Sequence, residues 1–118
     1  MSDFIYLASQ SPRRQELLKQ IGVRYEMLLP ALGEDAESIE IPLPQEKARD
    51  YVKRVTLAKA SLALARWRKS GLPWAPILCA DTTVSLPNSQ NGEILGKPID
   101  ADDARRILEI LSGKTHEV

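Results

Sequence analysis

The sequence has almost no cysteine or histidine. Cys79 and His116 are the only residues of their kinds among 118. A single cysteine permits no disulfide within the chain, which fits a reducing compartment. One cysteine and one histidine cannot form a zinc site without carboxylates, and nothing supports a nucleophile paired with a histidine base. Any chemistry is therefore expected from carboxylates, hydroxyls, lysines and arginines.

The chain also lacks an excess of charge and a long apolar run. Sixteen lysines and arginines balance sixteen aspartates and glutamates, which argues against a surface that binds nucleic acid stably. No segment approaches the roughly 20 apolar residues of a membrane span. The apolar segment "FIYLA" at 4–8 is too short for a signal peptide. We therefore expect one soluble, cytoplasmic domain with no membrane partner.

Two nucleotide-binding motifs are absent as well. No G-x-G-x-x-G follows the first expected strand, which argues against a dinucleotide-binding protein. The segment "SGKT" at 112–115 resembles the end of a P-loop, but Leu108 stands where that motif needs its first glycine. Gly113 is also expected to end a helix, whereas a P-loop glycine precedes one.

Hydrophobic patterning predicts alternating strands and helices. Strands are expected at 4–8, at 23–30 and, most strongly, at 75–86, with 93–95 returning as a hairpin partner after the turn at 87–92. Helices are expected at 12–21, from about 45 to 69, and at 101–112, and "THEV" at 115–118 begins another strand. The segment 31–44 is acidic and interrupted by proline, so we expect a loop there. This order indicates an α/β or α+β protein.

The ends of these helices carry recognisable signals. Ser11 is a favourable N-cap, Pro12 suits the first helical position, and Gly22 suits the position after the helix. Asp100 is expected to cap the last helix and Gly113 to end it. The residues expected to face the core are Leu17, Leu18 and Ile21 in the first helix, Ala48, Val52, Val55, Leu62 and Ala65 in the second, and Ile107, Leu108 and Leu111 in the third.

Two adjacent arginines occupy the first turn of the first expected helix. The N-terminus of a helix carries positive partial charge, so each cation there costs a few tenths to about 1 kcal/mol. One interpretation is a solvated basic turn. The other is an anion site, in which free N–H groups, the hydroxyls of Ser9 and Ser11 and the guanidinium groups of Arg13 and Arg14 converge on a phosphate.

Asp81 interrupts the strongest expected strand. A carboxylate inside a buried strand needs a partner or a function, and ligands of open α/β sheets bind at the carboxyl ends of the strands. Asp81 therefore either lies on a solvated face or caps a turn, or it acts as a metal ligand or as a general base for water.

Three further charged residues are candidates, each with an ordinary alternative. Lys59 falls in the apolar seam four residues after Val55, where its ammonium either extends to solvent or reaches into a site. Glu34 is either a solvated loop residue or, if it faces Asp81, a second carboxylate for Mg²⁺ or Mn²⁺. Lys97, in "LGKP", is either a turn lysine or a phosphate contact.

Taken in order, six segments resemble the Maf (septum-formation protein) family of nucleoside triphosphate pyrophosphatases: "LASQSPRRQELL", "GED", "YVKRVTLAKA", "ADTTV", "LGKP" and "LSGKTHEV". These segments are distributed along nearly the whole chain, from Leu7 to Val118. The resemblance implies an α/β, Maf/ITPase-like fold, with a mixed sheet flanked by helices and a cleft. It also implies hydrolysis of nucleoside triphosphates to monophosphate and pyrophosphate with a divalent metal, Mg²⁺ or Mn²⁺.

The resemblance assigns roles residue by residue. Asp81 matches the family's proton acceptor and, with the acidic Glu34, a position near the metal. The substrate-binding positions form a larger set: Ser9, Ser11, Arg13, Arg14, Lys59, Thr82 and Lys97. Within this set, Arg13 and Thr82 are similar to the branch that acts on dTTP and UTP, because the branch acting on 7-methyl-GTP has a tryptophan and a glutamine there.

Members of that family continue past "HEV" with further strands, helices and a third specificity residue. The resemblance therefore implies that residues 1–118 form a single incomplete domain whose C-terminal part is missing. Whether such a shortened chain is active stays open. The alternative function is a non-catalytic nucleotide-binding or cell-division regulatory module. The oligomeric state also stays open, a homodimer included.

Overall fold

The computed structural model describes residues 2–31, 34, 38–86 and 93–118. Its contacts divide the chain into two units, each of which is described by itself. The first comprises Met1–Ile41 and Val55–Ala80, and the second comprises Pro42–Arg54 and Asp81–Val118. The order of strands and helices confirms an α/β protein.

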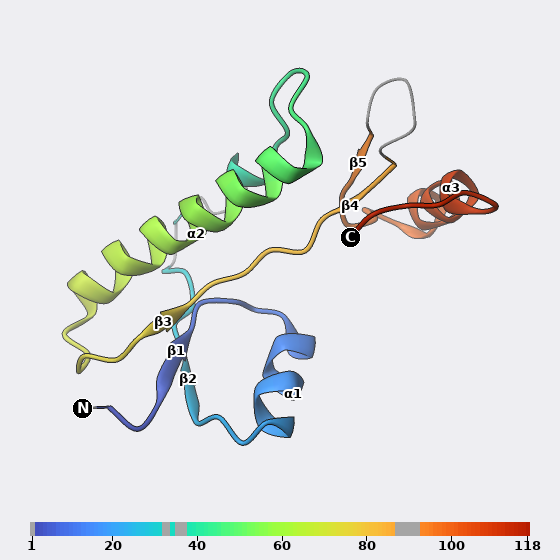
Figure 1. Ribbon diagram of the computed structural model, residues 1–118. Coiled ribbons are helices and arrows are strands. Elements are labelled where there is room, and N and C mark those ends of the chain that lie inside the picture. Colours follow the sequence, from blue (N-terminus) through green and yellow to red (C-terminus); the bar gives the residue numbers. More distant parts are fainter. Residues whose placement is uncertain (1, 32–33, 35–37, 87–92) are drawn as a thin grey trace. The chain divides into compact units, whose positions relative to one another are not determined.

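Three parallel strands form the sheet of the first unit. Strand β1 (Ile5–Leu7) lies between β2 (Tyr25–Met27) and β3 (Ile77–Leu78), as Figure 1 shows. Tyr6 is fully buried, and its hydroxyl donates a 2.7 Å hydrogen bond to the carbonyl of Pro73. Tyr6 forms the core of this unit together with Leu28, Ala63 and Ala75. The expected strands at 4–8 and 23–30 are thus confirmed.

Helix α1 (Pro12–Gln20) begins and ends where its sequence signals predict. Ser11 is the N-cap, and its side chain accepts a 3.3 Å hydrogen bond from the backbone N–H of Arg14. Gly22 has φ 73°, a left-handed conformation that glycine adopts without strain and that ends helices readily. Because these signals act within a few residues, the sequence alone is enough to place both ends.

Helix α2 (Ala48–Ser70) starts three residues later than expected, since Gln45 adopts φ 62° and leaves the helical region. Val55 is fully buried, as predicted. Ala65 is exposed, and the buried position in this part of the helix is Ala63, two residues earlier. The predicted seam was therefore displaced at its C-terminal end, where Ala63 belongs to the buried cluster around Tyr6.

The single strand expected at 75–86 is wrong. The structure has two short strands there, β3 and β4 (Val84–Ser85), and Asp81 lies between them outside any strand. Strand β3 ends at Leu78 because its partner β1 ends at Leu7, where the chain turns towards α1. Strand propensity describes a segment but not the length of the strand that it pairs with.

In the second unit, β4 pairs in antiparallel fashion with β5 (Ile94–Leu95), which confirms the expected hairpin partner. The turn expected at 87–92 lies outside the described residues. Ser85 also forms an antiparallel bridge with Glu117, with both N–H···O distances 2.9 Å. The strand expected at 115–118 is thus present as a single bridge. The parallel and antiparallel strands expected in one mixed sheet lie in two sheets.

Helix α3 (Ala101–Leu111) is capped by Asp100, whose side chain accepts a 2.7 Å hydrogen bond from the N–H of Asp103. Gly113 follows with φ 71°, as expected for a helix end. The predicted apolar faces of α1 and α3 are covered only in part. Leu18 is buried, but Leu17 and Leu108 are exposed. Burial of such a stripe requires a facing element, which the helical pattern itself does not specify.

Candidate functional site

The turn between β1 and α1 gathers hydroxyls and one guanidinium group. Nη1 of Arg14 donates a 3.0 Å hydrogen bond to Oγ of Ser9, and the same oxygen accepts a 3.1 Å bond from the N–H of Ser11. Arg14 is half-buried and folds back from the helix towards the turn. Ser9, Ser11 and Arg14 are therefore brought together at the carboxyl end of β1, where ligands of α/β sheets bind.

Arg13 points to a different environment. Its side chain is 68% exposed, and Nη1 lies 3.4 Å from Oε2 of Glu16, one turn along the helix. Exposed pairs of this kind contribute little to stability. The structure therefore separates the two arginines, with Arg14 tied to the turn and Arg13 exposed on α1.

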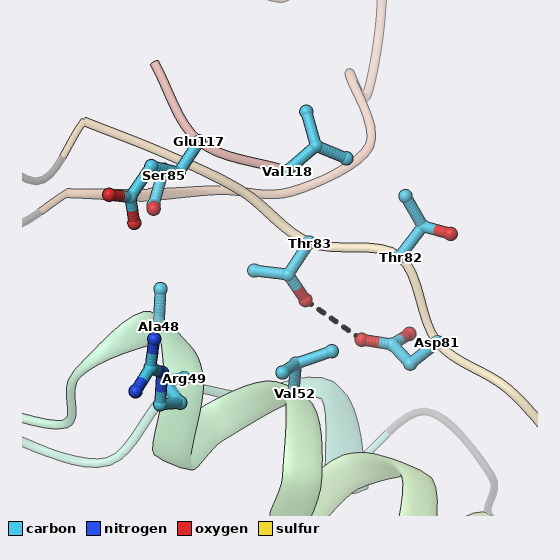
Figure 2. Close-up of a pocket in the computed structure, with 9 residues that line it drawn as sticks. All are labelled: Ala48, Arg49, Val52, Asp81, Thr82, Thr83, Ser85, Glu117 and Val118. Atoms are coloured by element: carbon cyan, nitrogen blue, oxygen red, sulfur yellow. Dashed lines mark hydrogen bonds between the residues drawn. The ribbon is translucent and has the colours of Figure 1, made fainter.

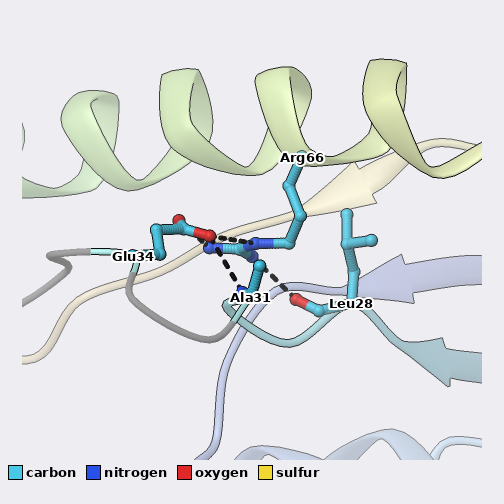
Figure 3. A network of polar contacts seen from close by, with 4 residues as sticks. All are labelled: Leu28, Ala31, Glu34 and Arg66. Atoms are coloured by element: carbon cyan, nitrogen blue, oxygen red, sulfur yellow. Dashed lines mark hydrogen bonds and ion pairs between the residues drawn. The ribbon is translucent and has the colours of Figure 1, made fainter.

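Glu34, in the segment after β2, is held by Arg66 of α2. Figure 3 shows the two side chains meeting as a carboxylate and a guanidinium fork. Nε of Arg66 lies 3.0 Å from Oε2 of Glu34, Nη2 donates to Oε1, and Nη1 donates a 2.8 Å bond to the carbonyl of Leu28. The N–H of Ala31 adds a 3.1 Å bond to Oε2. The hydrogen bonds from Arg66 are the main reason that the pKa of Glu34 is lowered.

This arrangement bears on the predicted metal site. Both carboxylate oxygens of Glu34 accept hydrogen bonds from Arg66, so a metal at this carboxylate would have to compete with the guanidinium group or share the oxygens with it. Among the residues described, no group of three or more His, Cys, Asp or Glu side chains gathers as a ready metal site. The role of Glu34 as a metal ligand stays a prediction.

Lys59 also takes a carboxylate partner. Nζ lies 2.8 Å from Oε1 of Glu40, in the short 3₁₀ helix η1 (Ser38–Glu40), and the lysine side chain is only 23% exposed. Cys79, just after β3, is close to the same region. Burial raises the pKa of the Cys79 thiol, and the positive charges of Arg66 and Lys59 act in the opposite direction. Lys59 thus turns towards the protein rather than extending freely into water.

The second unit contains a pocket of about 470 Å³, shown in Figure 2. Its lining includes Asp81 and three hydroxyl side chains that follow it closely, Thr82, Thr83 and Ser85. Oδ2 of Asp81 accepts a 2.8 Å hydrogen bond from Oγ1 of Thr83, which fixes the orientation of the carboxylate. The remaining lining residues are Ala48, Arg49 and Val52 of α2, and Glu117 and Val118.

The structure does not gather every predicted residue into this pocket. Asp81 and Thr82 line it, whereas Lys97 is exposed in the segment between β5 and α3. The other predicted residues, Ser9, Ser11, Arg13, Arg14, Glu34 and Lys59, belong to the first unit.

Two basic residues near these sites were not predicted to have a role. Arg66 holds Glu34 across 32 positions of sequence, and its place near the apolar stripe of α2 was the only local signal. Arg49 lines the pocket that contains Asp81. It stands in the first turn of its helix, like Arg13 and Arg14, so the same pattern of a cation at a helix start could have found it.

A parallel sheet whose first strand leads into a turn of hydroxyls and a guanidinium group defines an α/β protein suited to a small anionic ligand. Comparison with known proteins identifies the family. The chain belongs to the family described as Maf-like protein, whose model matches residues 4–118.

Several curated relatives are similar over nearly the whole chain. A dTTP/UTP pyrophosphatase of Burkholderia orbicola is 61% identical over 114 residues, which are 97% of this chain and 52% of the relative. Proteins with the same name from Albidiferax ferrireducens and Cupriavidus pinatubonensis are each 57% identical over 118 residues, or 100% of this chain and 57% of theirs. The chain thus spans about half the length of the curated relatives that it matches. No helix within the described residues is long and apolar enough to cross a membrane.

Proposed function

We propose that the protein is a nucleoside triphosphate pyrophosphatase that hydrolyses dTTP and UTP to the monophosphate and pyrophosphate. The observation that carries the proposal is the identity of 57–61% to proteins named dTTP/UTP pyrophosphatase over 97–100% of the chain. The orientation of Asp81 in a hydroxyl-lined pocket supports it, since a general base must be held in a defined direction.

Asp81 is proposed to accept the proton of the attacking water. The water oxygen forms a bond to the α-phosphorus, the bond from that phosphorus to the bridging oxygen breaks, and pyrophosphate leaves with the electron pair. Thr83 contributes by donating to Oδ2, which holds the carboxylate in one orientation. Reactions of this type depend mainly on positioning and on stabilisation of negative charge.

The proposed phosphate contacts are the groups that carry positive charge or hydroxyls. Ser9, Ser11 and Arg14 would bind phosphate oxygens at the turn after β1, and Lys59 and Lys97 would add ammonium groups. Arg13 and Thr82 are proposed to distinguish dTTP and UTP from other nucleotides. The 68% exposure of the Arg13 side chain supports this role, because a ligand can reach it without unpacking the helix.

A divalent cation, Mg²⁺ or Mn²⁺, is part of the proposal, and it would neutralise phosphate charge. Asp81 fits as a ligand because these ions take oxygen donors and are often bound by one or two carboxylates together with substrate phosphates. Glu34 is the second proposed ligand, and its carboxylate would either share its oxygens with Arg66 or exchange Arg66 for the metal.

The proposal is tested by measuring pyrophosphate release from dTTP, UTP, CTP, ATP and GTP, with Mg²⁺, with Mn²⁺ and with a chelator. We expect release from dTTP and UTP that the chelator abolishes. Comparable release from all five nucleotides would contradict the proposed specificity. Nucleotide binding without any release of pyrophosphate would favour a non-catalytic module.

A further inference from the structure

Glu40 provides a carboxylate partner for Lys59. Nζ of Lys59 and Oε1 of Glu40 are 2.8 Å apart, and their side chains are 23% and 41% exposed. The pair lies within the first unit. Lys59 is one of the groups proposed to bind substrate phosphate. In this structure its ammonium group pairs with a carboxylate of the protein, where the phosphate would bind.

The Lys59–Glu40 pair differs from two other ion pairs between α2 and the residues that precede it. Arg66 holds Glu34 with two nitrogens, and the carboxylate is 19% exposed. Arg54 likewise holds Glu46 through Nε and Nη2, and that carboxylate is only 8% exposed. Two-point guanidinium pairs are geometrically specific, whereas a lysine ammonium is a point charge with rotatable donors.

We infer that Glu40 is a specificity- and affinity-determining residue that competes with the triphosphate for Lys59. In the free protein, Glu40 holds the ammonium, and binding of a phosphate requires exchange of one anion for the other. A triphosphate carries more negative charge than a carboxylate and so wins the exchange, while a ligand of lower charge is at a disadvantage. This inference rests on the proposed role of Lys59 in binding the substrate.

The competition predicts a direction that a merely structural role would not. If Glu40 only stabilised the fold, its removal would either weaken the binding of nucleotide or leave it unchanged. If Glu40 competes, its removal strengthens binding. A partly exposed ion pair contributes at most about 1 kcal/mol, which sets the expected gain at about two- to fivefold.

The test compares Glu40→Gln with Glu93→Gln as a matched control. Glu93 also faces a basic side chain, 3.5 Å from Arg106, and belongs to the second unit. Both variants remove one negative charge. We expect Glu40→Gln to lower the KM for dTTP and the Kd for α,β-methylene-dTTP about two- to fivefold, with kcat changed less than twofold. Glu93→Gln should change neither constant by more than a small factor.

A double-mutant cycle with Lys59→Gln assigns the effect to the pair. In the Lys59→Gln background, Glu40→Gln should no longer improve binding of the analogue. Lys59→Met provides a second background, and melting curves show whether each variant folds. If Glu40→Gln improved binding equally in the parental protein and in the Lys59 variants, the inference would be overturned. The gain would then come from the removal of a negative charge in general and not from the release of Lys59.

The remaining outcomes separate this inference from the proposed function. Turnover of dTTP with no gain in Glu40→Gln overturns the competition alone. Binding of the analogue, tightened in Glu40→Gln, without turnover overturns the proposed catalysis but supports the competition. Absence of any binding overturns both.

Discussion

At the scale of single residues, several charged side chains of the first unit are engaged with polar or charged partners. Arg14 donates to Ser9, Lys59 faces Glu40, and Glu34 is held by Arg66. A guanidinium group at the start of a helix is unfavourable by itself, but Arg14 directs its charge towards a hydroxyl at the turn. The basic groups are thus held in position before any ligand arrives.

The ion pair of Glu34 leads to a prediction about how the stability of the protein depends on pH. Its pKa is lowered in the folded protein, chiefly by Arg66, so ionised Glu34 contributes stability above its usual pKa of 4.5. That contribution is lost as the pH falls from this value through the lowered pKa. Glu34→Gln should therefore reduce the free energy of unfolding by about 1–2 kcal/mol at pH 7, because Arg66 loses its charged partner.

The measurement is urea denaturation of the parent and of Glu34→Gln between pH 7 and pH 3. The difference between the two proteins should shrink as the solution is acidified. Glu16→Gln serves as the control, since Glu16 pairs with Arg13 at an exposed position and should change stability little. A difference that stays constant down to pH 3 would contradict the assigned role of the Glu34 charge.

At the scale of elements, α3 is stabilised by contacts at its first turn. Asp100 accepts from the N–H of Asp103, and Oδ2 of Asp103 accepts a 3.0 Å bond from the N–H of Ile99. The first bond satisfies an N–H group that the helix itself leaves without a partner, and the second ties the residue before the cap to the first turn. The bond from Ile99, followed by the hydrogen bond from the side chain of Arg106, lowers the pKa of Asp103.

Replacement of the cap gives the prediction at this scale. Asp100→Ala should lower the free energy of unfolding by about 0.5–2 kcal/mol, the usual effect of losing an aspartate N-cap. Asp102→Ala is the matched control, because Asp102 stands in the same turn without capping it. Thermal denaturation followed by circular dichroism compares the two, and equal stability of Asp100→Ala and the parent would show that the cap contributes nothing.

The elements also show where sequence reasoning succeeds and where it fails. The ends of α1 follow from Ser11, Pro12 and Gly22, which act within a few residues. The strand expected at 75–86 breaks because β1, about 70 residues away, offers only a short partner. Leu108 follows the helical pattern yet stays exposed, since a pattern shows which face can be buried but not what covers it.

For the candidate site too, the sequence predicts some features and not others. Residue types and spacing were sufficient to nominate Asp81, Lys59 and the serines and arginines of the first turn. Their partners were not predictable, because Arg66 meets Glu34 across 32 positions and Glu40 meets Lys59 across 19. Such pairings depend on how the acidic segment lies along α2, which no local pattern encodes.

At the scale of the whole molecule, we propose that the protein is a hydrolase with Asp81 as its general base. Relatives named dTTP/UTP pyrophosphatase match the chain over about half of their own length. Catalysis, substrate and metal are therefore proposals for the protein as a whole. Loss of a general base commonly reduces turnover about 10²- to 10⁴-fold.

The most direct test is the rate of pyrophosphate release from dTTP by Asp81→Asn, with Asp102→Asn as the control. Asparagine keeps the shape of the side chain and can still accept from Thr83, but it cannot take a proton from water. We expect Asp81→Asn to bind α,β-methylene-dTTP and to lose at least about 100-fold in kcat, while Asp102→Asn keeps the parental rate. Turnover by Asp81→Asn near the parental rate would contradict the account.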